Sequence, residues 1–149
     1  MNYAAMADSR SAREPGMNDE LNYSGDGTMF NISSVRIGDI TDGTSQTILL
    51  GEITNGIADA TAETTATGYD WAIGTVVAAG RGINPPGTIP GDRVFLKDGD
   101  AVWSLSSYHS GGANCAFADG STRMISENID QGLLEALATR SGSEPIGEY

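Results

Sequence analysis

The sequence predicts a single α+β domain over residues 1–149, built from a mainly antiparallel β-sheet, long loops and a C-terminal helix. Three observations predict this class: an apolar run at 47–53, a hairpin pattern at 113–124 and a helical pattern at 131–140. A chain of 149 residues can bury a core without disulfides or a structural metal. The 20 glycines and the apolar fraction of 39% indicate a loop-rich fold with a modest core.

The N-terminal quarter shows little regular patterning. Residues 1–28 are rich in Asn, Asp, Ser and Gly and have neither a 3.6-residue nor a two-residue apolar period, so we expect irregular surface structure. The segment 33–42 (SSVRIGDITD) alternates in part and ends at an Asp-Gly turn signal. Its inward-facing side chains are expected to be Val35, Ile37 and Ile40.

The middle of the chain contains two strand signals and a long loop. The run TILLGEI at 47–53 is apolar and rich in β-branched residues, which predicts a buried strand. After a small, polar segment at 54–68, an alternating aromatic pattern favours another strand, carried by Tyr69, Trp71 and Ile73. Residues 80–92 contain three prolines and several glycines, which continue neither a helix nor a central strand, so a loop is expected there.

The segment 113–124 has the pattern of a β-hairpin. Alternation predicts that Ala113, Cys115 and Phe117 share one face of a strand. Asp119-Gly120 then supplies the residues of a two-residue turn with positive φ at both positions. Thr122 and Met124 continue on the returning strand.

A helix is predicted from Gln131 to Arg140. Asp130 is its expected N-cap, because a carboxylate there accepts from the free amides of the first turn. Ile129 and Leu134 occupy the positions of a hydrophobic staple, and the apolar stripe consists of Leu133, Leu134 and Leu137. Arg140 in the last turn and Gly142 beyond it are typical of a helix end.

The charge balance excludes one large class of partner. Eight basic and 20 acidic residues give a formal charge of -12, which repels the phosphates of nucleic acids. No dinucleotide or P-loop motif is present, since Gly80-Arg81-Gly82 leads into prolines, so no nucleotide cofactor is expected. Cys115 is the single cysteine, which excludes an intramolecular disulfide. The first 16 residues have neither a signal-peptide core nor a membrane-spanning run, so we expect no membrane segment there.

The C-terminal third carries a spaced motif, in which a histidine is followed by nine residues and then Asp-Gly: His109 and Asp119-Gly120. The residues that flank this motif also fit the pattern: Gly111, Gly112, Asn114, Phe117, Ala118 and Ser121. In this segment the chain resembles the C-terminal part of the DUF1559 prepilin-like (pseudopilin-like) family, also known by the H-x9-DG signature, of planctomycetes and related bacteria.

Two further segments extend this resemblance. IGDITDGTSQTILLGE at 37–52 is similar to a second motif of the family, and Asn2-Tyr3-Ala4 is similar to the start of its globular part. Residues 54–100 match nothing specific. Three positions depart from the pattern: Ser110 where proline is common, Gln46 where asparagine is common, and Ser143-Glu144 where Gly-Glu is common.

The resemblance implies a pilin-like ectodomain that lacks its N-terminal anchor helix. Its expected location is extracytoplasmic, at the cell envelope, and its expected function is a structural or binding module for protein or carbohydrate partners. A sheet normally covered by such a helix exposes an apolar strip, so self-association is expected. A small hydrolase of the glycosidase or esterase type is the alternative, although no established catalytic motif is present.

Four residues are the candidates for that alternative: His109, Asp119, Glu52 and Asp42. Paired carboxylates such as Glu52 and Asp119 support glycoside hydrolysis only when about 5–10 Å apart. A Cys115-His109 dyad is a weaker option, because the strand pattern turns Cys115 inward. The competing interpretation is that His109 pins the hairpin by hydrogen bonds, and metal ligation is a third.

Loop carboxylates also suggest a cation. Asp98, Asp100 and Asp119 lie beside glycines, and calcium prefers such oxygen ligands. No calcium-binding repeat occurs, and Asx-turn chemistry accounts for such aspartates without a ligand. An aromatic platform for sugars would need exposure of Tyr69, Trp71, Trp103 and Tyr108, whereas aromatic residues in strands are more often part of the core.

Overall fold

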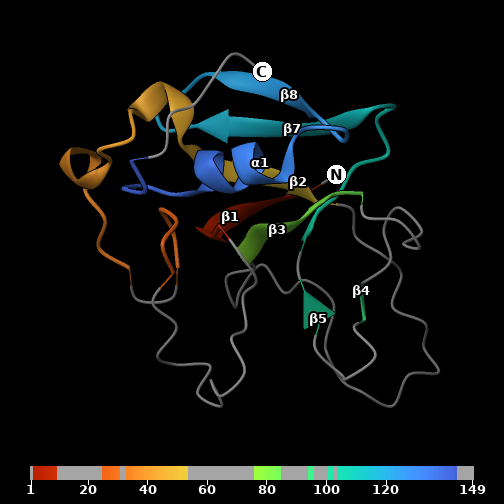
Figure 1. Ribbon diagram of the computed structural model, residues 1–149, viewed down its shortest axis with the longest axis horizontal. Coiled ribbons are helices and arrows are strands. Elements are labelled where there is room, and N and C mark those ends of the chain that lie inside the picture. The colour runs from red at the N-terminus through yellow and green to blue at the C-terminus, as the bar shows by residue number, and fades with distance from the viewer. Residues whose placement is uncertain are drawn as a thin grey trace.

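The computed structural model of the chain describes residues 2–9, 25–30, 33–53, 76–84, 94–95, 101–102 and 104–143. Within these ranges it is mostly β-sheet with one C-terminal helix, which confirms the α+β class. Figure 1 shows the helix α1 (Gln131–Ala138) lying across one face of the main sheet. None of the helices in these ranges is long and apolar enough to span a membrane.

The main sheet has six strands in the order β6-β3-β1-β2-β7-β8. Their bounds are β1 (Asn2–Asp8), β2 (Ile48–Ile53), β3 (Val76–Ile83), β6 (Ser104–Leu105), β7 (Gly112–Phe117) and β8 (Thr122–Ser126). The pairs β1–β2, β2–β7 and β7–β8 are antiparallel, whereas β1–β3 and β3–β6 are parallel, so the sheet is mixed. A separate antiparallel pair joins β4 (Val94–Phe95) to β5 (Ala101–Val102). Two short 3-10 helices precede β2, η1 (Ile37–Asp39) and η2 (Thr44–Gln46).

One apolar core lies between α1 and the sheet. Two leucines of the helix, Leu134 and Leu137, are fully buried in a cluster to which all six strands of the main sheet contribute side chains. The sheet side of this core includes Ala4, Met6, Ile53, Val77, Leu105, Ala113, Cys115, Phe117 and Ile125. Burial of these apolar surfaces is the main favourable contribution to folding.

The sheet curls until β6 approaches β2, although the two are not neighbours in the strand order. The Ser106 N–H, just after β6, donates to the Glu52 carbonyl at 3.0 Å. A Cβ added to Gly51 would lie 1.9 Å from Leu105 Cδ2. Gly51 therefore permits the close approach that gives the sheet its nearly closed, barrel-like curvature.

The predicted hairpin is confirmed, but its turn differs from the expected one. Ala113, Cys115 and Phe117 are all buried, as alternation predicts. Asp119 does not have positive φ, whereas Gly120 does, at 85°. The Gly120 N–H donates to the Phe117 carbonyl, so the loop is a three-residue turn closed by a left-handed glycine rather than a two-residue turn.

The helix begins as predicted and ends earlier. Asp130 caps it, accepting from the Leu133 N–H at 3.0 Å. The helix stops at Ala138 instead of Arg140, because the backbone of Thr139 is extended. The Thr139 hydroxyl lies 3.0 Å from both the Ala136 carbonyl oxygen and Asp42 Oδ2. Gly142 does not take the left-handed conformation expected of it, and Ser143 has positive φ instead, at 60°.

Two sequence interpretations of the first 40 residues were wrong. Residues 2–8 form β1, a central strand, rather than irregular surface structure. Its buried side chains are mostly small alanines, which carry little β-strand signal, so neighbouring strands on both sides determine the conformation. Ile37 is 72% exposed at η1 rather than inward-facing, while Val35 and Ile40 are half-buried.

The loop predicted at 80–92 was also partly wrong, because β3 continues through Ile83. A register shift between Ala78 and Ile83 and the positive φ of Gly82 accommodate the glycines as a bulge within the strand. The strand predicted around Tyr69, Trp71 and Ile73 lies outside the described residues.

Candidate functional site

The two sequence motifs meet at a buried carboxylate on β2. Glu52 is 1% exposed, and its Oε2 accepts from both the backbone N–H and the side-chain Nδ2 of Asn114, at 2.9 and 3.0 Å. The Nε2 atom of His109 lies 3.5 Å from Oε1 of the same carboxylate. Both Glu52 oxygens therefore face a partner, and the imidazole remains 44% exposed.

Strand pairing and a glycine corner produce this arrangement. Gly51 lies opposite Cys115, so the next pair along places Glu52 beside Asn114. After His109 the chain turns through Gly111, whose φ is +86°. A Cβ on Gly112 would lie 2.1 Å from the Ile125 carbonyl oxygen, so only glycine fits there.

Further hydrogen bonds hold the segment between β6 and β7 that carries His109. The Ser107 hydroxyl accepts from the His109 N–H at 3.0 Å, and the Ser107 N–H donates to Asn84 Oδ1 at 2.9 Å. Asn84, at a positive φ of 48°, also donates through Nδ2 to Glu127 Oε2 at 3.3 Å. We refer to the connected residues as the Glu52 cluster: Glu52, Asn84, Ser107, His109, Asn114 and Glu127.

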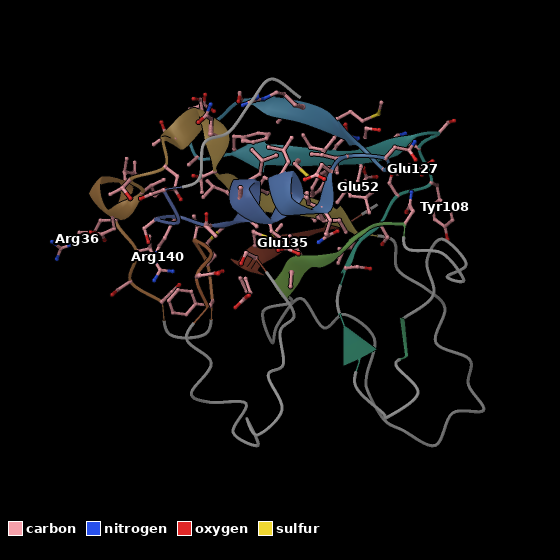
Figure 2. All side chains as sticks on the ribbon, viewed as in Figure 1. Arg36, Glu52, Tyr108, Glu127, Glu135 and Arg140 are labelled. Atoms are coloured by element: carbon pink, nitrogen blue, oxygen red, sulfur yellow. The ribbon has the colours of Figure 1, made fainter. Side chains whose placement is uncertain are left out.

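The Glu52 cluster occupies one end of the sheet. Figure 2 shows Glu52 and Glu127 toward the end at which Tyr108 lies, with Arg140 toward the other. Chemically, a half-exposed imidazole backed by a buried carboxylate can accept or donate a proton. Asn84 and Glu127 were missed by sequence reasoning, since Asn84 precedes two prolines in a predicted loop and Glu127 follows the hairpin without any motif.

Asp42, a sequence candidate, lies elsewhere and anchors the segment after α1. Its Oδ2 accepts from the Thr139 hydroxyl at 3.0 Å and from the Gly142 N–H at 2.7 Å. Its Oδ1 accepts from the Ser143 N–H at 2.8 Å. These bonds engage both oxygens of Asp42 with the end of the helix.

Asp119 is exposed at the hairpin turn. The adjacent Ser121 hydroxyl and then the Ser121 N–H, with a smaller effect of the Arg123 charge, lower the pKa of Asp119 below 3.8. The N–H donates to Oδ1 at 2.9 Å, whereas the hydroxyl makes no well-aligned hydrogen bond, so we regard the N–H as the firmer contact.

Glu52 and Asp119 are held at different points along the paired strands β2 and β7. Glu52 contacts Asn114, and Asp119 follows five residues later, beyond the end of β7. A rise of ~3.3 Å per residue gives roughly 10 Å from Asn114 to the end of β7 at Phe117, and Asp119 lies in the turn beyond that end.

Cys115 is buried in the core and is not poised to act with His109. Burial, and then the nearby Glu52 charge, raise the pKa of the Cys115 thiol from 9.0 to about 12. A nucleophilic cysteine needs a lowered pKa instead. The proposed Cys115-His109 dyad is therefore contradicted by both the position and the electrostatics of the thiol.

The metal candidates remain without a described site. Asp98 and Asp100 lie outside the described residues. Among the residues with described positions, no three His, Cys, Asp or Glu side chains form a metal-binding group. Of the aromatic platform, Tyr108 is 73% exposed, and Tyr69, Trp71 and Trp103 are not described.

Arg140 organises the opposite end of the sheet. Its NH1 donates to the carbonyl oxygens of Gly25 and Gly27, both at 2.7 Å, and its guanidinium lies 5.4 Å from the Phe30 ring centre. The Gly27 N–H in turn donates to the Ala7 carbonyl of β1. The sequence suggested only a favourable charge at the helix end, whereas the side chain fastens this loop to the sheet.

A comparison with family models matches residues 2–132 to the family described as "Protein of unknown function (DUF1559)". Searches of curated proteins and of solved structures found no significant match.

Proposed function

The chain belongs to the DUF1559 family, and from this premise we propose that it is a pseudopilin-like structural or binding module of the cell envelope, with protein or carbohydrate partners. The prepilin-like resemblance of its motifs supports the extracytoplasmic location. The acidic surface, with a formal charge of -12, favours solubility and disfavours nucleic-acid partners.

One observation supports a structural role most directly: three of the four candidate catalytic residues are engaged in holding the fold. Glu52 binds Asn114, Asp42 binds the segment after α1, and Asp119 bonds within its own turn. Residues that act on a substrate need to converge on a space that admits it. These three carboxylates bind groups in different parts of the fold, as expected of structural residues.

Protease treatment of intact cells tests the location. Cells that express the full-length native protein would be treated with proteinase K and probed with an antibody against this domain. The antibody signal should disappear without lysis, while a cytoplasmic marker survives. A signal that is lost only after lysis would argue against a surface module.

A small hydrolase is the second candidate, favoured by the contact between His109 and Glu52. A carboxylate behind an exposed imidazole is an arrangement that general bases use. Chromogenic esters and glycosides test it, with His109→Ala and Met124→Leu as test and control. Turnover by the wild type and Met124→Leu, but not by His109→Ala, would favour the enzyme; no turnover by any of the three would remove it.

A further inference from the structure

The outer edge of β8 is open to a further strand. β8 is the last strand in the sheet order, and none of the residues with described positions pairs with its outer side. Its burial alternates little, with only Ile125 fully buried. An edge of this kind presents backbone N–H and C=O groups that another extended chain can satisfy.

The alternation of hydrogen-bonded residue pairs between β7 and β8 identifies which backbone groups of β8 point outward. At one end of the hairpin the Phe117 N–H donates to the Ser121 carbonyl, and at the other the Glu127 N–H donates to the Gly111 carbonyl, both at 2.9 Å. In an antiparallel pair such bonding residues alternate with non-bonding ones. Odd-numbered residues of this strand therefore bond to β7, and the N–H and C=O groups of Thr122 and Met124 face outward.

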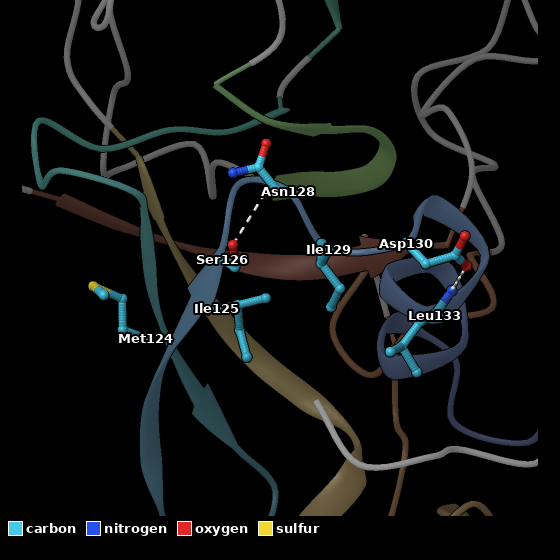
Figure 3. Close-up of a pocket in the computed structure, with 7 residues that line it drawn as sticks. All are labelled: Met124, Ile125, Ser126, Asn128, Ile129, Asp130 and Leu133. Atoms are coloured by element: carbon cyan, nitrogen blue, oxygen red, sulfur yellow. Dashed lines mark hydrogen bonds between the residues drawn. The ribbon is translucent and has the colours of Figure 1, made fainter.

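An apolar pocket adjoins this edge. Figure 3 shows it between the end of β8 and the first turn of α1. Its volume is about 310 Å³, at the lower end of the range of ligand pockets. Ile125, Ile129 and Leu133 supply most of its apolar lining, which suits an aliphatic or aromatic side chain, and Met124 borders it from β8 with its side chain directed away from the helix.

The rim of the pocket is acidic. Asp130 lines it, with Oδ1 engaged by the Leu133 N–H and the side chain exposed. Glu127, directly after β8, is also exposed; it does not line the pocket, and its Oε2 accepts from Asn84 Nδ2. With a formal charge of -12 on the whole chain, this rim favours a cationic neighbour over an anionic one.

We propose that β8 and this pocket bind an extended segment of a partner protein, which adds a strand at Thr122 and Met124 and inserts an apolar side chain flanked by lysine or arginine. The proposal deepens the proposed binding function by naming the surface and the partner chemistry. Main-chain pairing supplies affinity in this mode, and the pocket supplies selectivity.

A labelled peptide tests this proposal. The probe is a short peptide of alternating valine and threonine with lysine at both ends, titrated to about 1 mM and followed by fluorescence anisotropy. Saturable binding is expected. Substitution of the central residue by proline, or of both lysines by glutamate, should weaken it at least about tenfold, because each removes one element of recognition.

Two protein variants separate the backbone and charge contributions. Met124→Pro removes only an outward N–H, whereas Met124→Leu keeps it, so affinity should fall about tenfold in the first and stay within about threefold in the second. Asp130→Asn keeps a good N-cap but loses the charge, so it should weaken binding and reduce its salt dependence. Amide chemical shifts of Thr122 and Met124 on peptide addition give a readout that needs no variant.

The outcomes distinguish this proposal from the general function. No saturable binding, or equal binding by Met124→Pro and Met124→Leu, would overturn the β8 site, while the cell-surface experiment would still stand or fall separately. A dimer in light scattering that Met124→Pro converts to a monomer would also overturn it, since a second copy would then occupy the β8 edge.

Discussion

Replacement of Glu52 by alanine is expected to destabilise the domain more than any other change in the Glu52 cluster. Alanine leaves the backbone N–H and the Nδ2 group of Asn114 without their acceptor. An unsatisfied buried donor costs about 1–3 kcal/mol. Because Asn114 is only half-buried, its amide can partly turn to water, so we expect about 3 kcal/mol in total rather than the full sum.

This loss corresponds to a melting temperature lower by about 6–12 °C for a domain of this size. Circular dichroism melts and urea titrations would measure it. Glu52→Gln should recover at least half of the loss, because its carbonyl oxygen can still accept from the Asn114 N–H. The matched control is Glu135→Ala, which removes a carboxylate that accepts a hydrogen bond from Gln131 on the same helix and should cost less than about 1 kcal/mol.

A melting temperature for Glu52→Ala within about 1 °C of the wild type would refute this reasoning, because two half-buried donors that both lose their acceptor should lower stability measurably. If that variant also lost a hydrolytic activity shown by the wild type, Glu52 would be a catalytic group rather than a structural one.

Further predictions concern the neighbouring motif residues and the exposed sheet. His109→Ala should lower the melting temperature by only a few degrees, since the ring is 44% exposed and the His109–Glu52 pair contributes less than about 1 kcal/mol. An unchanged melting temperature together with loss of a hydrolytic activity would contradict this. Gly120→Val should cost about 1 kcal/mol or more in urea melts, because φ is +85° although space is free, and an unchanged midpoint would disprove it. Gly112→Ala should cost more, because its Cβ would collide with backbone. The pKa of Cys115 is raised from 9.0 to about 12, so the contribution of this thiol to the free energy of unfolding is complete below pH 9 and is lost between about pH 9 and 12. Cys115→Ala should reduce that alkaline loss of stability. The pKa of Asp119 is lowered, so the contribution of this carboxylate to the free energy of unfolding is present above pH 3.8 and is lost as the pH falls below that value. Asp119→Asn should remove that acid dependence. Light scattering should reveal self-association of the wild type, and a monomer at all concentrations would count against an uncovered apolar strip.

The C-terminal third was the part of the fold most readily predicted from sequence, since its signals are local. Alternation marked the buried face of β7, and the Asp130 cap marked the start of α1. The hairpin turn was misassigned, because Asp-Gly fits both a two-residue turn and a three-residue turn that ends in a left-handed glycine. Only the backbone angles of Asp119 separate these two.

Long-range contacts explain what the sequence could not provide. β1 is made largely of alanines, whose strand conformation depends on β2 and β3 on either side. His109 and Glu52 were both identified as candidates, but their contact spans 57 positions of sequence and follows from the pairing of β2 with β7. Asn84, directly after β3, completes the cluster with a side chain that no local pattern marks.

Two exposed apolar side chains, Tyr3 and Met124, lie on the sheet face that α1 does not cover. Pairing of Tyr3 with Glu52, and of Asn114 with Met124, places these residues on the sheet face opposite the one that includes Ala4 and Ile125, which α1 covers. Tyr3 and Met124 are 49% and 57% exposed there. The Glu52 cluster lies on this same face, so a partner that covered it would also restrict solvent access to His109.

The spacing of the signature follows from the length of one strand. His109 precedes β7 and Asp119 follows it, so the nine intervening residues comprise the glycine corner, the strand and the start of the turn. One end contacts β2, where His109 reaches Glu52, and the other contacts η2, where the Asp119 N–H donates to the Thr44 carbonyl at 3.0 Å. A slip of one residue would turn the buried face of β7 outward. The two residues of the signature thus lie at opposite ends of β7, each in contact with the segment that contains η2 and β2, and their spacing matches the length of that strand.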